Sequence, residues 1–215
     1  MGQCGGGRST GAPARGISLK VTTIHDLIGD LVSGDDERAE AAALRMATLP
    51  PEQSQAALSA LTDLLQQGDE DQRWWAVRAL TELQVDGAVG LLVAALGDRA
   101  CSVRQCAALG LRLRPDLLAI PALTAALEES DSLLAALAGD ALIAIGAPAV
   151  PGLLEVLNKG HQNARLEAVR ALAEIGDERA IPELFASLDE DSALMEYWAS
   201  EGLDRMGVGM TYFFP

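Results

Sequence analysis

The stretch RLEAVRALAEIG at residues 165–176, followed by IPELFASL at residues 181–188, decides the fold. In both segments small and aliphatic residues recur every three or four positions, which is the spacing of one face of an α-helix. Gly176 stands where a helix ends in a left-handed residue, and Pro182 stands in the first turn of the next helix, where a missing N–H costs nothing. The two segments therefore predict a helix, a tight turn and a second helix.

The same pattern recurs along the chain at intervals of 31, 31, 30 and 31 residues. An aliphatic column lies in the first helix of each unit: Leu58, Val89, Ile120, Val150 and Ile181. A column that is always alanine lies in the second helix: Ala76, Ala107, Ala138, Ala168 and Ala199. Three residues later comes a column of alanine or glycine: Ala79, Gly110, Ala141, Ala171 and Gly202. Residues this small on a buried stripe predict that two helix backbones approach closely.

A divergent first unit over residues 24–49 brings the number of helical hairpins to about six. One hairpin cannot bury both of its faces, so the units must stack and share a continuous core. The predicted fold class is all-α, an α-α superhelix (α-solenoid) over residues 21–207. Residues 1–20 are interpreted as a disordered glycine-rich tail, and residues 208–215 as a C-terminal aromatic tail or cap.

The motif Arg165-x-x-Ala168-x-x-Ala171-Leu172-x-x-Ile175-Gly176, followed by Ile181-Pro182-x-Leu184, resembles the short HEAT-like repeats of the phycobilisome (PBS) lyase type. The resemblance covers residues 24–207. It implies an armadillo-like helical scaffold that binds other proteins, since enzymes are scattered members of this repeat family.

Two kinds of departure from the repeat pattern stand out. Arg73, Arg104 and Arg165 share one position in their units, where two other units carry Ala135 and Glu196. In the third unit Arg114-Pro115 replaces the Ile-Gly ending of the second helix. We expect these units to stack less regularly.

Composition and charge exclude several classes of protein. Hydrophobic residues make up 49% of the chain but aromatic residues only 4%, which favours helices with an aliphatic core over a β-sandwich. The net charge is −15, and no basic cluster lies outside the N-terminus, so we expect no nucleic-acid partner. Acidity favours partners with basic segments, because opposite charge speeds encounter.

Several sequence features indicate a cytoplasmic protein without a membrane span. Residues 1–16 lack an apolar signal segment, and the odd number of cysteines suggests a reducing compartment. The stretch 132–154 has one charge, Asp140, but Gly146, Pro148 and Pro151 interrupt it. Its apolar residues also follow the spacing of the other repeats, so we expect them to face the shared core and make no membrane contact.

No catalytic, cofactor-binding or metal-binding residues are expected. His25 and His161 are not followed by glutamate, although His-Glu pairs bind the iron of the HEAT-like hydroxylases of the deoxyhypusine type. Acidic clusters at residues 69–71, 128–131 and 189–191 precede second helices, where carboxylates cap free N–H groups. We interpret them as structural.

The outward face of the second helices is the candidate binding site. A solvated helix face should be polar, yet this one mixes aromatic, aliphatic and arginine side chains, which anchor protein interfaces. The candidate partner-binding residues on this concave face are Trp74, Val77, Arg78, Gln105, Leu109, Arg112, Ile143, Leu166, Arg170 and Tyr197. The alternative is that they pack against a neighbouring helix.

The sequence thus predicts a non-catalytic scaffold that binds a protein or peptide on its concave face. The resemblance implies an alternative, a phycobilin lyase-like subunit that assists bilin attachment to phycobiliproteins. Another alternative is a structural subunit that joins a larger assembly or a second copy through the aromatic C-terminal end. That end holds six of the eight aromatic residues: Phe185, Tyr197, Trp198, Tyr212, Phe213 and Phe214.

Overall fold

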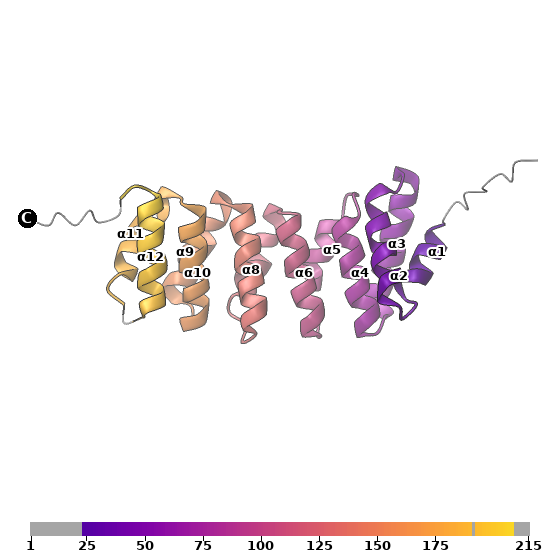
Figure 1. Ribbon diagram of the computed structural model, residues 1–215, viewed down its shortest axis with the longest axis horizontal. Coiled ribbons are helices and arrows are strands. Elements are labelled where there is room, and N and C mark those ends of the chain that lie inside the picture. The colour runs from indigo at the N-terminus through magenta and orange to yellow at the C-terminus, as the bar shows by residue number, and fades with distance from the viewer. Residues whose placement is uncertain (1–22, 191, 209–215) are drawn as a thin grey trace, which may run out of the picture.

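The computed structural model describes residues 23–190 and 192–208, which form a single row of paired helices (Figure 1). Within these residues there are twelve α-helices and no strand. The helices are α1 (Ile24–Leu31), α2 (Asp36–Arg45), α3 (Pro51–Gln67), α4 (Glu70–Glu82), α5 (Ala88–Ala95), α6 (Cys101–Leu113), α7 (Ile120–Ala126), α8 (Ser132–Ile145), α9 (Val150–Lys159), α10 (Gln162–Ile175), α11 (Ile181–Ser187) and α12 (Ala193–Arg205). Short 3-10 turns η1 (Met46–Thr48), η2 (Leu117–Ala119), η3 (Ala147–Ala149) and η4 (Glu178–Ala180) follow α2, α6, α8 and α10.

Each odd-numbered helix pairs with the even-numbered helix that follows it, so the described residues contain six hairpins. This confirms the predicted all-α solenoid. Successive even-numbered helices pack against one another, whereas successive odd-numbered helices touch only sparsely. The even layer is therefore the more closely packed of the two.

Local sequence fixes where the helices begin and end. Asp69 caps α4 in a capping box with Gln72, as predicted for that acidic cluster, and Asp131 accepts from the first backbone N–H groups of α8. At α12 the N-cap is Ser192, whose side chain accepts from the backbone N–H of Met195, so a serine and not an acid of the cluster at 189–191 caps this helix. Gly176 ends α10 at φ 66°, the left-handed conformation that the repeat pattern predicts.

The core is the predicted aliphatic one. All five members of the alanine column at position 76 and its equivalents are completely buried. A Cβ added to Gly110 on α6 would lie 2.5 Å from Thr81 Oγ1 on α4. A Cβ added to Gly202 on α12 would lie 2.8 Å from the Cα of Ala173 on α10. The small column thus lets adjacent even helices approach closely, as predicted.

The irregular ending of the third unit has a structural role of its own. Arg114 lies at the end of α6, and its Nη1 donates to the carbonyl oxygens of Leu80 at 2.9 Å and Leu83 at 2.5 Å. These carbonyls belong to the C-terminal end of α4, where the helix leaves acceptors unpaired. Arg114 therefore joins two successive units at the position where the repeat loses its glycine.

No single helix among residues 23–190 and 192–208 is long and apolar enough to cross a membrane. The segments 132–145 and 147–159 meet the length and composition criteria only as a pair, and they are bent by 120°. The predicted N-terminal tail lies outside the described residues, as do Tyr212, Phe213 and Phe214 of the C-terminal tail.

Candidate functional site

The predicted partner-binding residues lie on five successive even helices. They are Trp74, Val77 and Arg78 on α4, Gln105, Leu109 and Arg112 on α6, Ile143 on α8, Leu166 and Arg170 on α10, and Tyr197 on α12. Tyr197 is 56% exposed and Leu109 is 40% exposed. Trp74, Ile143 and Leu166 are half-buried and pack against the core. We call the surface formed by Trp74, Leu109, Ile143, Leu166 and Tyr197 the even-layer face.

Val77 does not belong to this surface. Its side chain is 0% exposed and lies in the hydrophobic core. The prediction was wrong because it treated the second helix as buried on one stripe. In the structure α4 is flanked by α2 and α6 as well as by α3, so the buried arc extends around to Val77.

The three predicted arginines are held in ion pairs between neighbouring even helices. Arg78 on α4 pairs with Glu40 on α2 at 2.6 Å. Arg112 on α6 and Arg170 on α10 both pair with Asp140 on α8, at 3.2 Å and 2.9 Å. These side chains join the helices of the layer, and the apolar residues of the layer lie between them.

Gln105 belongs to a polar group with Asp131 and Cys101. Its Nε2 donates to Asp131 Oδ2 at 2.8 Å, and the Cys101 thiol donates to the same carboxylate. The hydrogen bond between the Cys101 thiol and the Asp131 carboxylate raises the pKa of Cys101 and lowers the pKa of Asp131. Burial raises the pKa of Cys106 to about 12. Both thiols therefore stay protonated at neutral pH and are poor nucleophiles.

A cleft of about 670 Å³ opens at the N-terminal end of α4, between the α1–α2 loop and the first turn of α6. It is lined by two tryptophans and four carboxylates, and we call it the acidic cleft: Asp36, Asp69, Glu70, Asp71, Trp74 and Trp75. The two indoles meet edge to face, with ring centroids 4.8 Å apart and planes at 87°.

This cleft was not predicted from the sequence, because residues 69–71 were interpreted only as helix caps. The available signal was the acidic run Glu70-Asp71 followed within five residues by the pair Trp74-Trp75. Asp36 is the first residue of α2, and Glu70 is the first residue of α4. Both carboxylates therefore lie at the same edge of the solenoid.

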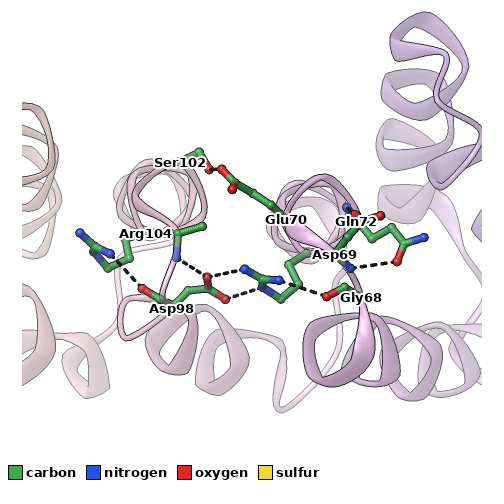
Figure 2. Close-up of polar contacts among 9 residues, drawn as sticks. Gly68, Asp69, Glu70, Gln72, Asp98, Ser102 and Arg104 are labelled. Atoms are coloured by element: carbon green, nitrogen blue, oxygen red, sulfur yellow. Dashed lines mark hydrogen bonds and ion pairs between the residues drawn. The ribbon is translucent and has the colours of Figure 1, made fainter.

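Arg73, the basic residue of the repeat pattern, has a structural role on the opposite side of α4. Its side chain is 5% exposed, and its Nε and Nη2 donate to the two oxygens of Asp98 at 2.8 Å and 2.9 Å. Its Nη1 donates to the carbonyl of Gly68 at 3.0 Å. Figure 2 shows Asp98 between α4 and α6, where Arg104 Nη1 donates to its carbonyl oxygen at 3.0 Å. Arg73 thus links the loop before α4, at Gly68, to the loop before α6, at Asp98.

The other acidic clusters contribute to similar links. Arg104 pairs with Glu129 at 3.1 Å, and Arg165 pairs with Glu190. Among the described residues, no group of three or more His, Cys, Asp or Glu side chains is placed to hold a metal ion.

Comparison with known families agrees with this geometry. The family described as HEAT repeats matches residues 58–143 and 120–204, which together make up more than half of the chain. This chain belongs to the HEAT-repeat family. Among solved structures, the solenoid is similar to a designed armadillo repeat protein in complex with the peptide (KR)4, with a TM-score of 0.54 and 20% identity. The match covers 85% of this chain and 99% of the design, and it demonstrates the shared fold.

Curated relatives of this HEAT-repeat chain are named for bilin and phycobilisome assembly. Phycocyanobilin lyase subunit beta of Pseudanabaena tenuis is 42% identical over 97 residues, which is 45% of this chain and 34% of the relative. The phycobilisome maturation protein of Synechococcus elongatus is 39% identical over 89 residues, which is 41% of this chain and 43% of the relative. The resemblance to PBS lyase repeats is therefore confirmed, and the matched part spans less than half of either relative.

Proposed function

We propose that this HEAT-repeat chain binds a protein partner through the even-layer face and acts as an accessory subunit in bilin attachment to phycobiliproteins. The observation that carries this proposal is the 42% identity over 97 residues with phycocyanobilin lyase subunit beta. The similarity to a phycobilisome maturation protein supports the same assignment.

The even-layer face suits protein recognition because its apolar side chains are accessible while its arginines are already paired. Leu109 and Tyr197 are both more than one third exposed, and Trp74 adds an indole at the other end of the row. Aromatic and aliphatic anchors with charged groups around them are characteristic of protein interfaces. We assign contact with the partner to these anchors, and the maintenance of helix spacing to Arg78, Arg112 and Arg170.

In this proposal the chain positions its partner, and neither of the two cysteines in the described residues supplies a reacting group. The thiols of Cys101 and Cys106 have raised pKa values, from the hydrogen bond to Asp131 and from burial respectively. A thiolate nucleophile is therefore not available from either residue at neutral pH. The bilin and the acceptor protein would react with each other while the solenoid holds one of them.

Reconstitution of bilin attachment tests the proposal. The chain is co-expressed with an apo-phycobiliprotein, a bilin source and a second lyase subunit, and the visible absorption of the purified phycobiliprotein is measured under denaturing conditions. We expect covalently bound pigment only when the chain is present. No gain in pigment over the sample without the chain would remove the lyase role.

A matched pair of variants tests whether the even-layer face is the surface used. The double variant Leu109→Ala/Tyr197→Ala removes two exposed anchors and should lower pigment attachment about tenfold. The control Leu117→Ala/Leu118→Ala removes two leucines that are 62% and 70% exposed, but lie on η2 away from this face. Equal loss in both variants, or loss only in the control, would contradict the assignment.

A second candidate function is a structural role in a larger assembly through the last repeat. Three large side chains of that repeat are at least 40% exposed: Phe185, Leu194 and Tyr197. The mass in solution, measured with and without residues 208–215, tests this role. A monomer in both cases would remove contact between copies through this end.

A further inference from the structure

The acidic cleft carries more uncompensated charge than its role in helix capping requires. Asp69 accepts from the backbone N–H of Gln72 at 2.9 Å, which caps α4, and Glu70 accepts from Ser102 Oγ at 2.6 Å. Within residues 23–190 and 192–208, no side chain pairs with the carboxylates of Asp36 or Asp71. Two of the four carboxylates are therefore available to a ligand.

Among the described residues, no lysine or arginine lines this cleft. The cation closest in sequence, Arg73, is bound to Asp98 on the other side of α4. Figure 2 shows Glu70 and Ser102 on one side of the two helices, and Asp98 and Gly68 on the opposite side. Arg38, on α2, is paired with Asp30. A concave site with carboxylates of one sign concentrates negative potential and attracts cations.

The tryptophans show which kind of cation suits the cleft. Trp74 and Trp75 both line it and are both half-buried, so their positions are fixed by the core while part of each ring faces the cleft. An indole face attracts a cation, and a planar guanidinium can stack on it while bonding a carboxylate. The volume of about 670 Å³ is larger than a single ion needs and is in the range of sites that hold an organic ligand.

We propose that the acidic cleft receives an arginine side chain from a basic segment of the protein partner. This inference rests on the proposed function, because it names the chemistry by which the even layer recognises its partner. The guanidinium lies against Trp74 or Trp75 and bonds to Asp36 and Asp71, and Trp74 connects the cleft to the even-layer face. The partner thus meets a charged pocket at one end of the row and apolar anchors along the rest.

Direct binding of a short peptide to the purified chain tests this proposal without any bilin chemistry. The probe is a fluorescein-labelled (Arg-Gly)3 peptide, with (Lys-Gly)3 and (Glu-Gly)3 as comparisons, followed by fluorescence anisotropy. We expect (Arg-Gly)3 to bind, (Lys-Gly)3 to bind at least threefold more weakly, and (Glu-Gly)3 not to bind. No binding of (Arg-Gly)3, or equal affinity for the arginine and lysine peptides, would overturn the assignment.

Two charge-matched variants separate the cleft from general attraction to an acidic protein. The variant Asp36→Asn/Asp71→Asn should weaken (Arg-Gly)3 binding about fivefold to tenfold. The control Asp63→Asn/Asp204→Asn removes the same charge from exposed positions on α3 and α12, and should change affinity less than twofold. Equal weakening by the two variants would overturn the proposal in favour of non-specific attraction.

The variant Trp75→Leu tests the aromatic contribution while keeping an apolar side chain against the core. We expect about fivefold weaker binding of (Arg-Gly)3 with an unchanged circular dichroism spectrum. Unchanged affinity in both Trp75→Leu and Trp74→Leu would overturn the role of the indoles. Loss of peptide binding with normal pigment attachment would refute the cleft alone, whereas normal peptide binding without pigment attachment would refute the bilin role alone.

Discussion

The junction between α4 and α6 and the junction between α8 and α10 are built on the same apolar columns but have different polar links. At the first, Arg73 binds both oxygens of Asp98 and both side chains are largely buried. At the second, Ala135 replaces the arginine, and His161 Nε2 lies 3.1 Å from the carbonyl of Glu128 at an exposed site. The second junction also has the ion pair between Arg170 and Asp140 at 2.9 Å, which is more exposed than that between Arg73 and Asp98. The two junctions thus differ in how deeply their ion pairs are buried.

The largest effect should come from Arg73→Met, which leaves the Asp98 carboxylate without its partner. Breaking a buried pair on one side costs about 3–5 kcal/mol, because the remaining charge stays desolvated. Urea unfolding followed by circular dichroism measures the loss. The double variant Arg73→Met/Asp98→Ala should recover part of this loss, and a loss below about 1 kcal/mol for the single variant would place the strength of this junction in the apolar columns.

Alanine substitutions of one glycine at each junction sharpen the comparison. In Gly110→Ala the new Cβ meets Thr81 Oγ1 at 2.5 Å, inside a buried contact, so we expect a loss of about 1–3 kcal/mol. In Gly139→Ala the Cβ meets Arg170 Nη2 at 2.9 Å, and this long side chain can move away. We expect a smaller loss there, measured as the difference in urea midpoint. Gly90→Ala, with nothing within 4 Å, is the control and should not destabilise the chain. Equal losses of stability at positions 110 and 139 would contradict the expectation that Thr81 is less able than Arg170 to move away from the added methyl group.

A smaller effect is expected for His161→Ala at the second junction. His161 Nδ1 accepts from the backbone N–H of Ala164 at 3.3 Å, which caps α10, and its contact with Glu128 is exposed. Loss of the cap should cost about 0.5–1 kcal/mol, and the exposed contact adds little. Thermal unfolding compares it with His161→Asn, which keeps a capping side chain. A loss as large as that of Arg73→Met would mean that the two junctions are equally dependent on polar links.

The smallest expected effect is a difference in pH dependence between the junctions. The hydrogen bond from Arg73 lowers the pKa of Asp98 below its ordinary value. As the pH falls, Asp98 therefore takes up a proton in the unfolded chain before it does so in the folded chain. The stabilising contribution of the Asp98–Arg73 pair is present above about pH 4, and it is lost as the pH falls through the lower folded pKa. Unfolding free energies of the wild type and Asp98→Asn should converge below pH 4. A constant difference between them down to pH 2 would contradict this.

The sequence was sufficient to predict the architecture because each repeat column has the same surroundings in every unit. Five alanines at one position and five small residues three positions later require close helices, and the structure places them there. The surface was harder to predict, because exposure depends on the neighbours in both directions along the row. Val77 was misassigned for this reason, while Tyr197 lies on α12, which has no further helix beyond it among the described residues.

Polar partners were also beyond sequence reasoning, because they join positions with no fixed spacing. Arg73 was recognised as a repeat residue, but its partner Asp98 lies 25 residues away in the next loop. The acidic cleft combines Asp36 with residues 69–75, and the longer first connection hides their common register. Only the stacked arrangement shows that they face the same space.

Asp140 has a consequence for how the chain unfolds. This carboxylate on α8 is shared by Arg112 of the preceding repeat and Arg170 of the following one. In a simple solenoid each repeat is coupled only to its immediate neighbours, so unfolding can begin at one end and proceed unit by unit. A single anion held from both sides adds a modest coupling between α8 and both of its neighbours. Fraying from either end should therefore become less favourable when it reaches α6, α8 and α10.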